Sequence, residues 1–254
     1  MGRITETVKW LIIINIVFFV GTLLYDNLAY RLFSLYYFEN EQFQVWQPIT
    51  HMFMHGGFAH ILFNMYGLFA FGSPLEARWG TKKFLFFYFS AGIGAALVHT
   101  GVNYFTFHQG LEAMMNTGLT DTQVLEMMAD SMRQVATNSA GQYSVNLPTG
   151  IDVDSYNNML SAYSGTAVGA SGAVYGVLVA FGLMFPNIEL MLIFLPIPIK
   201  AKYFIPLMIA GDLFFGVTGS PFGIAHWAHI GGALFGFIMA YYWKRNSMNH
   251  TRWD

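Results

Sequence analysis

The sequence predicts an all-α membrane protein, a bundle of six transmembrane helices with a polar insertion between the third and fourth helices. Three observations support this prediction. Hydrophobic residues make up 55% of the 254 residues and charged residues only 10%, whereas a soluble domain carries about 25% charged residues. Six apolar segments are about long enough to cross a bilayer. Lys and Arg lie mainly on one side of these segments.

The apolar segments define the expected helices. They comprise residues 8–25, 57–76, 84–105, 168–186, 203–219 and 226–243. The first segment follows Arg3 and Lys9, and no small-residue cleavage site comes after it. We therefore expect a retained first span rather than a secretory signal.

Basic residues predict the orientation in the membrane. With the N-terminus on the inner side, 10 of the 12 Lys and Arg residues fall in inner segments and only Arg31 and Arg133 in outer segments. Because cytoplasmic loops are enriched in Lys and Arg, we expect both termini in the cytoplasm. The net charge of −2 gives no argument for a nucleic-acid partner. The absence of cysteine excludes disulfides and thiolate metal sites.

A polar segment, residues 106–163, interrupts the apolar pattern on the outer side. We expect it to be a partly helical insertion within one membrane domain that covers residues 1–254. Thr120 and Gln123 match a capping box, followed by apolar residues at helical spacing. An amphipathic helix is expected there, and then a looser stretch around Gly141–Gly150. The insertion is either a surface elaboration or a cap that screens substrates.

Residues 188–199 form a shorter apolar stretch between the fourth and fifth spans. They include Pro196 and Pro198, and Lys200 and Lys202 follow. Two prolines this close together rule out a regular helix. We expect a short cytoplasmic loop that dips into the membrane interface.

Ser171 opens the fourth apolar segment between Gly169 and Gly172. Backbone N–H groups at a helix start have no partner within the helix, and they can donate to a developing oxyanion. The two glycines would let a substrate backbone come close. Tyr175 lies four residues on and therefore on the same helix face. The alternative interpretation is a helix cap with a packing seam of small residues.

The sixth segment carries His226 and His229 near its start. Gly232 and Gly236 continue the face of His229, and small residues at this spacing let helices pack closely. If they meet the matching pair Gly172 and Gly176, Ser171 and His229 come within hydrogen-bonding distance. Histidine is well suited to general-base catalysis near neutral pH. For His226 a structural hydrogen bond or a place at the water interface is the favoured interpretation.

His60 and Asn64 lie four residues apart on the second segment, and both side chains can donate to an oxyanion. His51 and His55 share the spacing of zinc ligands, but the H-E-x-x-H pattern is missing. We expect these two to be structural, with no metal and no cofactor. No acidic residue is a clear partner for the histidine, and Asp212 lies in or near the fifth segment. The sequence therefore predicts a Ser–His dyad.

Together these motifs resemble the rhomboid family of intramembrane serine proteases. The resemblance rests on H-x-x-x-N at His60 and Asn64, G-x-S-G at residues 169–172, and A-H-x-x-G at residues 228–232. It covers about residues 8–243 apart from the insertion.

The resemblance implies a role for each site residue. Ser171 would be the nucleophile and His229 the base, which Tyr175 would orient by stacking. His60, Asn64 and the Ser171 N–H would form the oxyanion hole, and His226 would lie near the loop that covers the site.

The resemblance also implies partners and a location. Substrates would be single-span membrane proteins cut in the bilayer, with the fifth span as a lateral gate. The protein would be a multi-pass component of the bacterial inner membrane, and its site would open to the outer side.

Two features depart from the family pattern. A Trp-Arg pair is common in the loop between spans one and two, where this chain has Trp46 and Gln47. The insertion at residues 106–163 is also long for the family. The first departure bears on how that loop is anchored, and the second on substrate access.

Three other functions compete with this interpretation. A non-proteolytic rhomboid relative would bind membrane clients, but such proteins usually lack the serine or the histidine. A transporter would line a pathway with polar residues and would show inverted repeats, which are absent from the sequence. A metalloprotease would need a carboxylate beside the histidine cluster, and EDTA sensitivity would reveal it.

Overall fold

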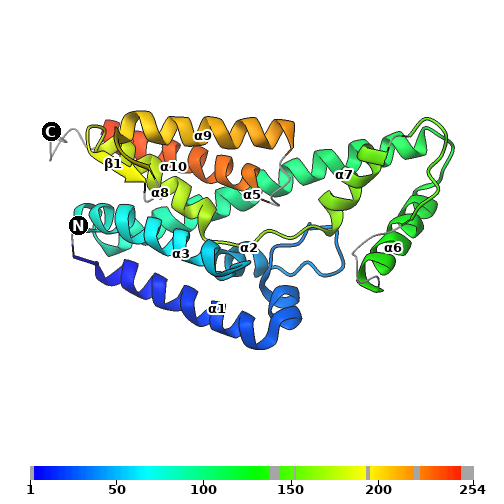
Figure 1. Cartoon of the computed structure of the whole chain (residues 1–254), viewed down its shortest axis with the longest axis horizontal. Helices are drawn as coiled ribbons and strands as arrows, with labels where there is room; N and C mark the ends of the chain where they lie inside the picture. Colours follow the sequence, from blue (N-terminus) through cyan, green and yellow to red (C-terminus); the bar gives the residue numbers. More distant parts are fainter. Residues whose placement is uncertain (1–2, 138–143, 152, 193–194, 220–223, 247–254) are drawn as a thin grey trace. The chain divides into compact units, whose positions relative to one another are not determined.

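The structure, a computed structural model, describes residues 3–137, 144–151, 153–192, 195–219 and 224–246. It is mostly helical (Figure 1). The helical elements are α1 (Glu6–Phe33), α2 (Gln47–Thr50), η1 (His51–Phe53), α3 (Phe58–Gly67), η2 (Leu68–Gly72), α4 (Ser73–Trp79), α5 (Thr81–Met115), α6 (Asp121–Thr137), α7 (Val153–Ser164), α8 (Ser171–Met184), α9 (Ala201–Thr218) and α10 (His226–Asn246).

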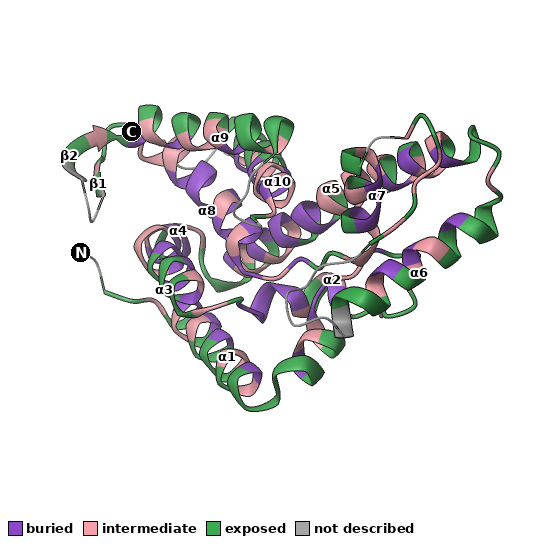
Figure 2. Ribbon diagram, turned by 45° about the vertical axis from the view of Figure 1, so that its right-hand side comes forward, coloured by how far each residue is buried: buried purple, intermediate pink, exposed green. Residues whose placement is uncertain are grey.

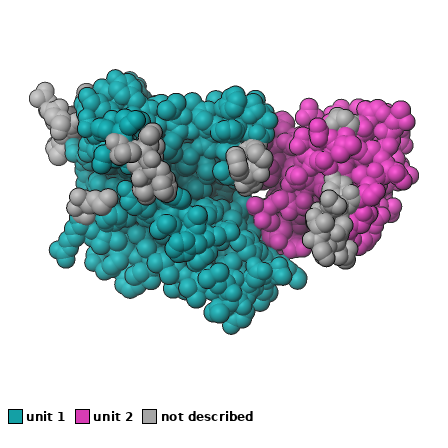
Figure 3. All heavy atoms as spheres, viewed as in Figure 1, with its two compact units in different colours: residues 1–35, 45–99, 167–254 teal, residues 36–44, 100–166 magenta. Residues whose placement is uncertain are grey.

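The chain divides into two compact units (Figure 3). Unit 1 comprises residues 1–35, 45–99 and 167–254, and unit 2 comprises residues 36–44 and 100–166. Unit 2 therefore contains the predicted insertion, residues 106–163, together with the end of α5 and a short segment that follows α1.

Each of the six predicted spans is helical, although the bounds differ. The second is a continuous helical run, Phe58–Trp79, in which η2 is a π-helical segment. In the described part of the chain, three helices are long and apolar enough to cross a membrane, α1, α5 and α9. Helix α8 is apolar but has only 14 residues. The count of six spans therefore stays a prediction.

The surface of α1 is suited to lipid. Its buried residues are few, whereas ten large apolar side chains between Ile13 and Leu32 are exposed (Figure 2). Monomeric soluble proteins rarely expose apolar patches of this extent. The helix is interrupted at Asp26, where φ is 12° and ψ is −98°. This break falls directly after the predicted end of the first span, Tyr25.

The core of unit 1 lies around α8, which contacts η2, α9 and α10. Nine of its 14 residues are buried. They pack with apolar residues from other elements, including Leu68 of η2, Phe87 of α5 and Ile205 of α9. Helix α8 therefore holds its first residue, Ser171, on a tightly packed support.

Glu76, in the first turn of α4, fixes the start of α1 to α4. Its carboxylate accepts hydrogen bonds from the backbone N–H groups of Thr7 and Val8, each at 3.0 Å. It also accepts hydrogen bonds from the hydroxyl groups of Thr5, Thr7 and Thr81. A carboxylate at a helix N-terminus satisfies orphan donors and the helix dipole together.

Glu76→Gln is expected to destabilise the protein by about 2–4 kcal/mol, because the new amide NH₂ faces donors rather than acceptors. Thermal unfolding in detergent should show a Tm lower by at least about 5 °C. Glu6→Gln is the matched control, since Glu6 is exposed and pairs with the nearby Lys9; its effect should stay within about 1 kcal/mol. If the two variants had the same Tm, the stabilising role assigned to Glu76 would be contradicted.

The predicted cytoplasmic loop at residues 188–199 is instead a β-hairpin. Strand β1 (Glu189–Leu192) pairs antiparallel with β2 (Leu195–Lys200), with Glu189 opposite Lys200. The prolines exclude a helix, as expected, but they are compatible with an edge strand that donates few hydrogen bonds. The fold is therefore mostly helical rather than strictly all-α.

Unit 2 has an apolar core of its own, formed by Tyr37, Phe107, Met114, Val124, Met128, Tyr156, Met159, Leu160 and Ala162. The predicted capping box is present. The Gln123 backbone N–H donates to Thr120 Oγ1 at 3.3 Å, and the Thr120 N–H donates to Gln123 Oε1 at 2.8 Å. Helix α6 follows, as expected. Helix α7 lies where the sequence predicted no separate helix, and the start of the predicted looser stretch, residues 141–143, lies outside the described residues.

Candidate active site

Ser171 and His229 meet where two helices begin. Ser171 is the first residue of α8, and His229 lies in the first turn of α10. The His229 Nε2 atom is 2.9 Å from Ser171 Oγ. The predicted contact between these two side chains is therefore present.

A glycine seam brings α8 and α10 together. A Cβ atom on Gly232 would lie 1.8 Å from the carbonyl oxygen of Gly172, and one on Gly236 would lie 2.5 Å from the Cα atom of Gly176. Only glycine permits this approach, so the predicted seam is confirmed. Gly172 also faces Ala95, 2.4 Å from its would-be Cβ. Helix packing thus accounts for Gly172 as part of the predicted seam, and its expected role in substrate approach stays a prediction.

Tyr175, one turn after Ser171, stacks on His229, as the family resemblance implied. The ring centroids are 4.2 Å apart and the rings are inclined by 11°. This contact fixes the plane of the imidazole.

Gly169 brings His60 next to Ser171. Its φ of +125° lies in a region that favours glycine. A Cβ atom there would lie 2.7 Å from His60 Nε2 and 3.5 Å from Ser171 Oγ. The Gly169 N–H donates to the His51 carbonyl oxygen at 2.9 Å, which holds the loop in place.

The hydrogen bond at the other ring nitrogen sets the tautomer of His60. The Gly56 N–H donates to His60 Nδ1 at 3.3 Å. In a neutral imidazole the proton then resides on Nε2, which faces Gly169 and Ser171. His60 therefore presents a donor to the space beside the serine.

Asn64 follows one turn after His60 on α3 and is 5% exposed. Its Nδ2 atom is buried and has no hydrogen-bond partner among the residues that the structure describes. Buried amide donors are nearly always satisfied, so this N–H group is available to an acceptor that a bound molecule would bring.

His51 and His55 are structural, as expected. His51 Nδ1 is 2.9 Å from the Gln47 carbonyl oxygen, and His55 Nδ1 is 3.3 Å from that of Phe53. Both side chains are buried. These contacts order the segment that precedes α3.

Trp46 and Gln47, which depart from the family pattern, anchor α2 to the end of α1. The Trp46 indole N–H donates to the Leu32 carbonyl oxygen at 2.8 Å, and the Gln47 amide donates to that of Arg31 at 3.4 Å. The Gln47 side chain is fully buried. A neutral amide thus makes a backbone contact at the position where a charged side chain is common.

Asp212 is the site residue that the sequence analysis missed. Its Oδ1 atom is 2.9 Å from His229 Nδ1 and 2.5 Å from His226 Nδ1, and its Oδ2 atom accepts a hydrogen bond from the Tyr175 hydroxyl. The sequence analysis found no clear acidic partner for the histidine. The sequence did contain an indication of its importance, because Asp212 is the one acidic residue in the interior of any of the six apolar segments.

His226 is the first residue of α10, buried against Phe215 with ring centroids 5.7 Å apart. Its contact is with Asp212, which agrees with the structural hydrogen bond that the sequence favoured. The loop that it was expected to adjoin includes residues 220–223, which lie outside the described part of the chain.

Within the described residues, one group of side chains could hold a metal ion: Asp212, His226 and His229, whose ligand atoms lie within 4.8 Å of one another. These atoms already face one another as hydrogen-bonding partners. His51 and His55, which share the spacing of zinc ligands, are not part of this group.

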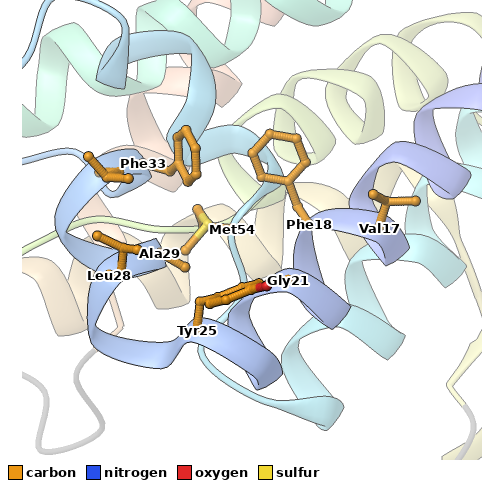
Figure 4. A pocket seen from close by; sticks show the side chains of 9 residues that line it. Val17, Phe18, Gly21, Tyr25, Leu28, Ala29, Phe33 and Met54 are labelled. Carbon is orange, nitrogen blue, oxygen red and sulfur yellow. The ribbon is translucent and has the colours of Figure 1, made fainter.

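An apolar pocket of about 230 Å³ lies beside the break in α1 (Figure 4). It is lined by Val17, Phe18, Gly21, Tyr25, Leu28, Ala29, Leu32, Phe33 and Met54. None of these residues belongs to the cluster around Ser171, and Tyr25 is the one lining residue with a polar side-chain group.

The family model of the Rhomboid domain matches residues 42–120 and 123–246 of this chain. This match includes the whole cluster around Ser171, which consists of His60, Asn64, Gly169, Ser171, Tyr175, Asp212, His226 and His229. The chain belongs to the rhomboid family.

Several curated rhomboid proteins are similar in sequence. An uncharacterized mitochondrial rhomboid protein of Schizosaccharomyces pombe is 26% identical over 80% of this chain and 53% of its own length. The rhomboid protease GlpG of Yersinia pseudotuberculosis is 26% identical over 57% of this chain and 50% of its own length. A putative rhomboid protease of Bacillus subtilis is 42% identical over 19% of this chain and 24% of its own length. The chain thus spans about half the length of the first two relatives.

This rhomboid protein is an integral, multi-pass membrane protein. Family membership and the long apolar helices agree on this point. The exposed apolar face of α1 fits the same conclusion, because lipid rather than water would contact it.

Proposed function

We propose that this rhomboid protein is a serine endopeptidase that cleaves transmembrane segments of single-span membrane proteins within the bilayer. The observation that carries the proposal is the 2.9 Å contact between Ser171 Oγ and His229 Nε2. Relatives that are named rhomboid proteases support it.

In this proposal Ser171 is the nucleophile and His229 the general base. His229 Nε2 takes the hydroxyl proton as Oγ attacks the scissile carbonyl carbon, and an oxyanion forms. Collapse of the tetrahedral intermediate breaks the C–N bond, and the imidazolium returns the proton to the leaving amine. Water, deprotonated by the same imidazole, then hydrolyses the acyl-enzyme and releases Ser171.

Three donors are proposed for the oxyanion: His60 Nε2–H, the Asn64 amide and the Ser171 backbone N–H. Two observations support this set. The Asn64 Nδ2 atom is buried and has no partner in the described part of the chain, and His60 presents its Nε2 atom beside the space next to Ser171. Such preorganised donors are effective because they need no reorientation during the reaction.

Asn64→Ala is expected to lower kcat by roughly 10–1,000-fold with little change in KM, since one oxyanion donor acts mainly in the transition state. The measurement is the steady-state cleavage rate of a single-span reporter. Asn15→Ala is the control, because Asn15 is also buried in an apolar helix but donates to the Leu11 carbonyl oxygen of its own helix. Equal rates for the two variants would remove Asn64 from the oxyanion hole.

We further propose six spans, with both termini in the cytoplasm and a site that opens to the outer side. The bias of basic residues toward one side supports this orientation. The proposed location is the bacterial inner membrane. Accessibility of single introduced cysteines to a membrane-impermeant reagent tests the topology, because the chain has no cysteine of its own.

The activity is tested with purified protein in detergent and a tagged single-span reporter. We expect two fragments whose masses place the cut inside the reporter's membrane segment, formed equally with and without EDTA. A protein that binds reporters without cutting any, and whose serine does not react with a fluorophosphonate, would be a non-proteolytic rhomboid that binds membrane clients.

A further inference from the structure

We infer that Asp212 is the positioning residue of this site, so that the protein works with a Ser171–His229–Asp212 triad rather than a dyad. The inference rests on the proposed protease function. It begins with the contact between Asp212 Oδ1 and His229 Nδ1 at 2.9 Å, on the side of the ring opposite Ser171.

The carboxylate sets the tautomer of His229. An ionised carboxylate only accepts hydrogen bonds, so His229 Nδ1 must carry a proton. In the neutral ring Nε2 then has a free electron pair and faces the Ser171 hydroxyl as an acceptor. This is the form of imidazole that a general base requires.

The carboxylate also matches the charge that develops on His229. When the ring takes the Ser171 proton it becomes an imidazolium, and the negative charge of Asp212 lies directly beside it. Asp212 is 7% exposed, so water screens this pair weakly. Attraction that grows along the reaction lowers the barrier rather than tightening substrate binding.

Asp212 itself is held in place by two further side chains. The Tyr175 hydroxyl donates to Oδ2, and His226 Nδ1 lies 2.5 Å from Oδ1. These partners come from α8 and α10, whereas Asp212 comes from α9. A buried carboxylate in an apolar helix is costly unless it is paired, and this arrangement pairs it on both oxygens.

The other titratable groups around His229 are two histidines. His60 of α3 and His99 of α5 lie close enough to interact electrostatically with it. Neither supplies a negative charge. Among the described residues that interact with His229, Asp212 is therefore the one that can compensate an imidazolium.

The test compares Asp212→Asn and Asp212→Glu with wild type in the reporter assay. Asp212→Asn keeps the shape but lets an amide NH₂ face His229 Nδ1, which favours the wrong tautomer. We expect kcat to fall by about 100-fold or more with KM within about threefold. Asp212→Glu, which restores the carboxylate, should recover at least a tenth of the wild-type kcat. Asp130→Asn, the same change at an exposed position of α6, should match wild type.

Additional readouts separate this role from a structural one. Rates are corrected for the folded fraction, measured by thermal unfolding, and a fluorophosphonate should label Ser171 of Asp212→Asn at least about 30-fold more slowly than in wild type. If the corrected kcat of Asp212→Asn equals that of wild type, the inference is wrong while the protease function stands. Loss of wild-type activity in EDTA, with recovery in zinc, would overturn it in favour of a metal site. A wild-type protein that neither cleaves nor reacts would overturn the proposed function and this inference together.

Discussion

Ser171→Ala is expected to abolish cleavage of a single-span reporter, with a loss of at least about 10,000-fold in kcat. Without Oγ there is no nucleophile to form the acyl-enzyme, and the remaining donors can only bind the substrate. The small side chain fits the same place at the start of α8, so the fold should be retained. The measurement is the initial rate of reporter cleavage in detergent, at a known reporter concentration.

Ser73→Ala is the matched control for this change. Ser73 is also a buried serine at the start of a helix, α4, and among the described residues its hydroxyl has no hydrogen-bond partner. Its activity should lie within about threefold of wild type. Cleavage by Ser171→Ala at more than a hundredth of the wild-type rate would show that the nucleophile is another group.

His229→Ala is expected to cost about as much as Ser171→Ala, because nucleophile and base act as one unit. The double variant should therefore be hardly slower than either single variant. The loss should appear in kcat, since His229 contacts Ser171 Oγ rather than a remote part of the substrate. Reporter cleavage by the two single variants and the double variant measures this non-additivity.

His108→Ala serves as the control histidine, since His108 lies in unit 2 and faces Glu39 at 3.5 Å. It should cleave at the wild-type rate. If the effects of Ser171→Ala and His229→Ala multiplied in the double variant, the two residues would act independently and the proposed mechanism would fail.

The sequence predicted the contact between α8 and α10 because close packing of two helix backbones requires glycines, which can be recognised in the sequence. A helix pair that packs at the distance of Gly232 and Gly172 tolerates no side chain, so glycines must recur at helical spacing on both helices. The capping box of α6 was also predictable, because it is formed by two residues close in the sequence, Thr120 and Gln123. Such features depend on residues near one another in the chain.

Asp212 was missed for the opposite reason. Its role depends on three side chains, Tyr175, His226 and His229, which approach it from two other helices. Neither the rotation of α9 nor the depth of its twelfth residue, Asp212, in the bundle is encoded in an apolar segment. The sequence showed only that a carboxylate, which is energetically unfavourable in an apolar helix, lies in this segment. It did not show which residues pair with that carboxylate.

The first and last residues of the helices and strands were also predicted less well than the presence of these elements. Helix α5 continues to Met115, ten residues beyond the predicted end of the third span. Its continuation loses the apolar pattern because it enters the polar segment, but it has no proline that would end it. The β-hairpin at residues 189–200 was taken for a loop, because Pro196 and Pro198 argue against regular structure although an edge strand accepts them.

The most direct test of the account is to locate the residue that reacts with a fluorophosphonate in the wild-type protein. Intact mass followed by peptide mapping should show one adduct per chain on Ser171, and none in His229→Ala over the same time. The label reports an activated nucleophile and does not require the natural substrate. An adduct on a different serine, or cleavage of the reporter by a protein that takes up no label, would contradict the central claim.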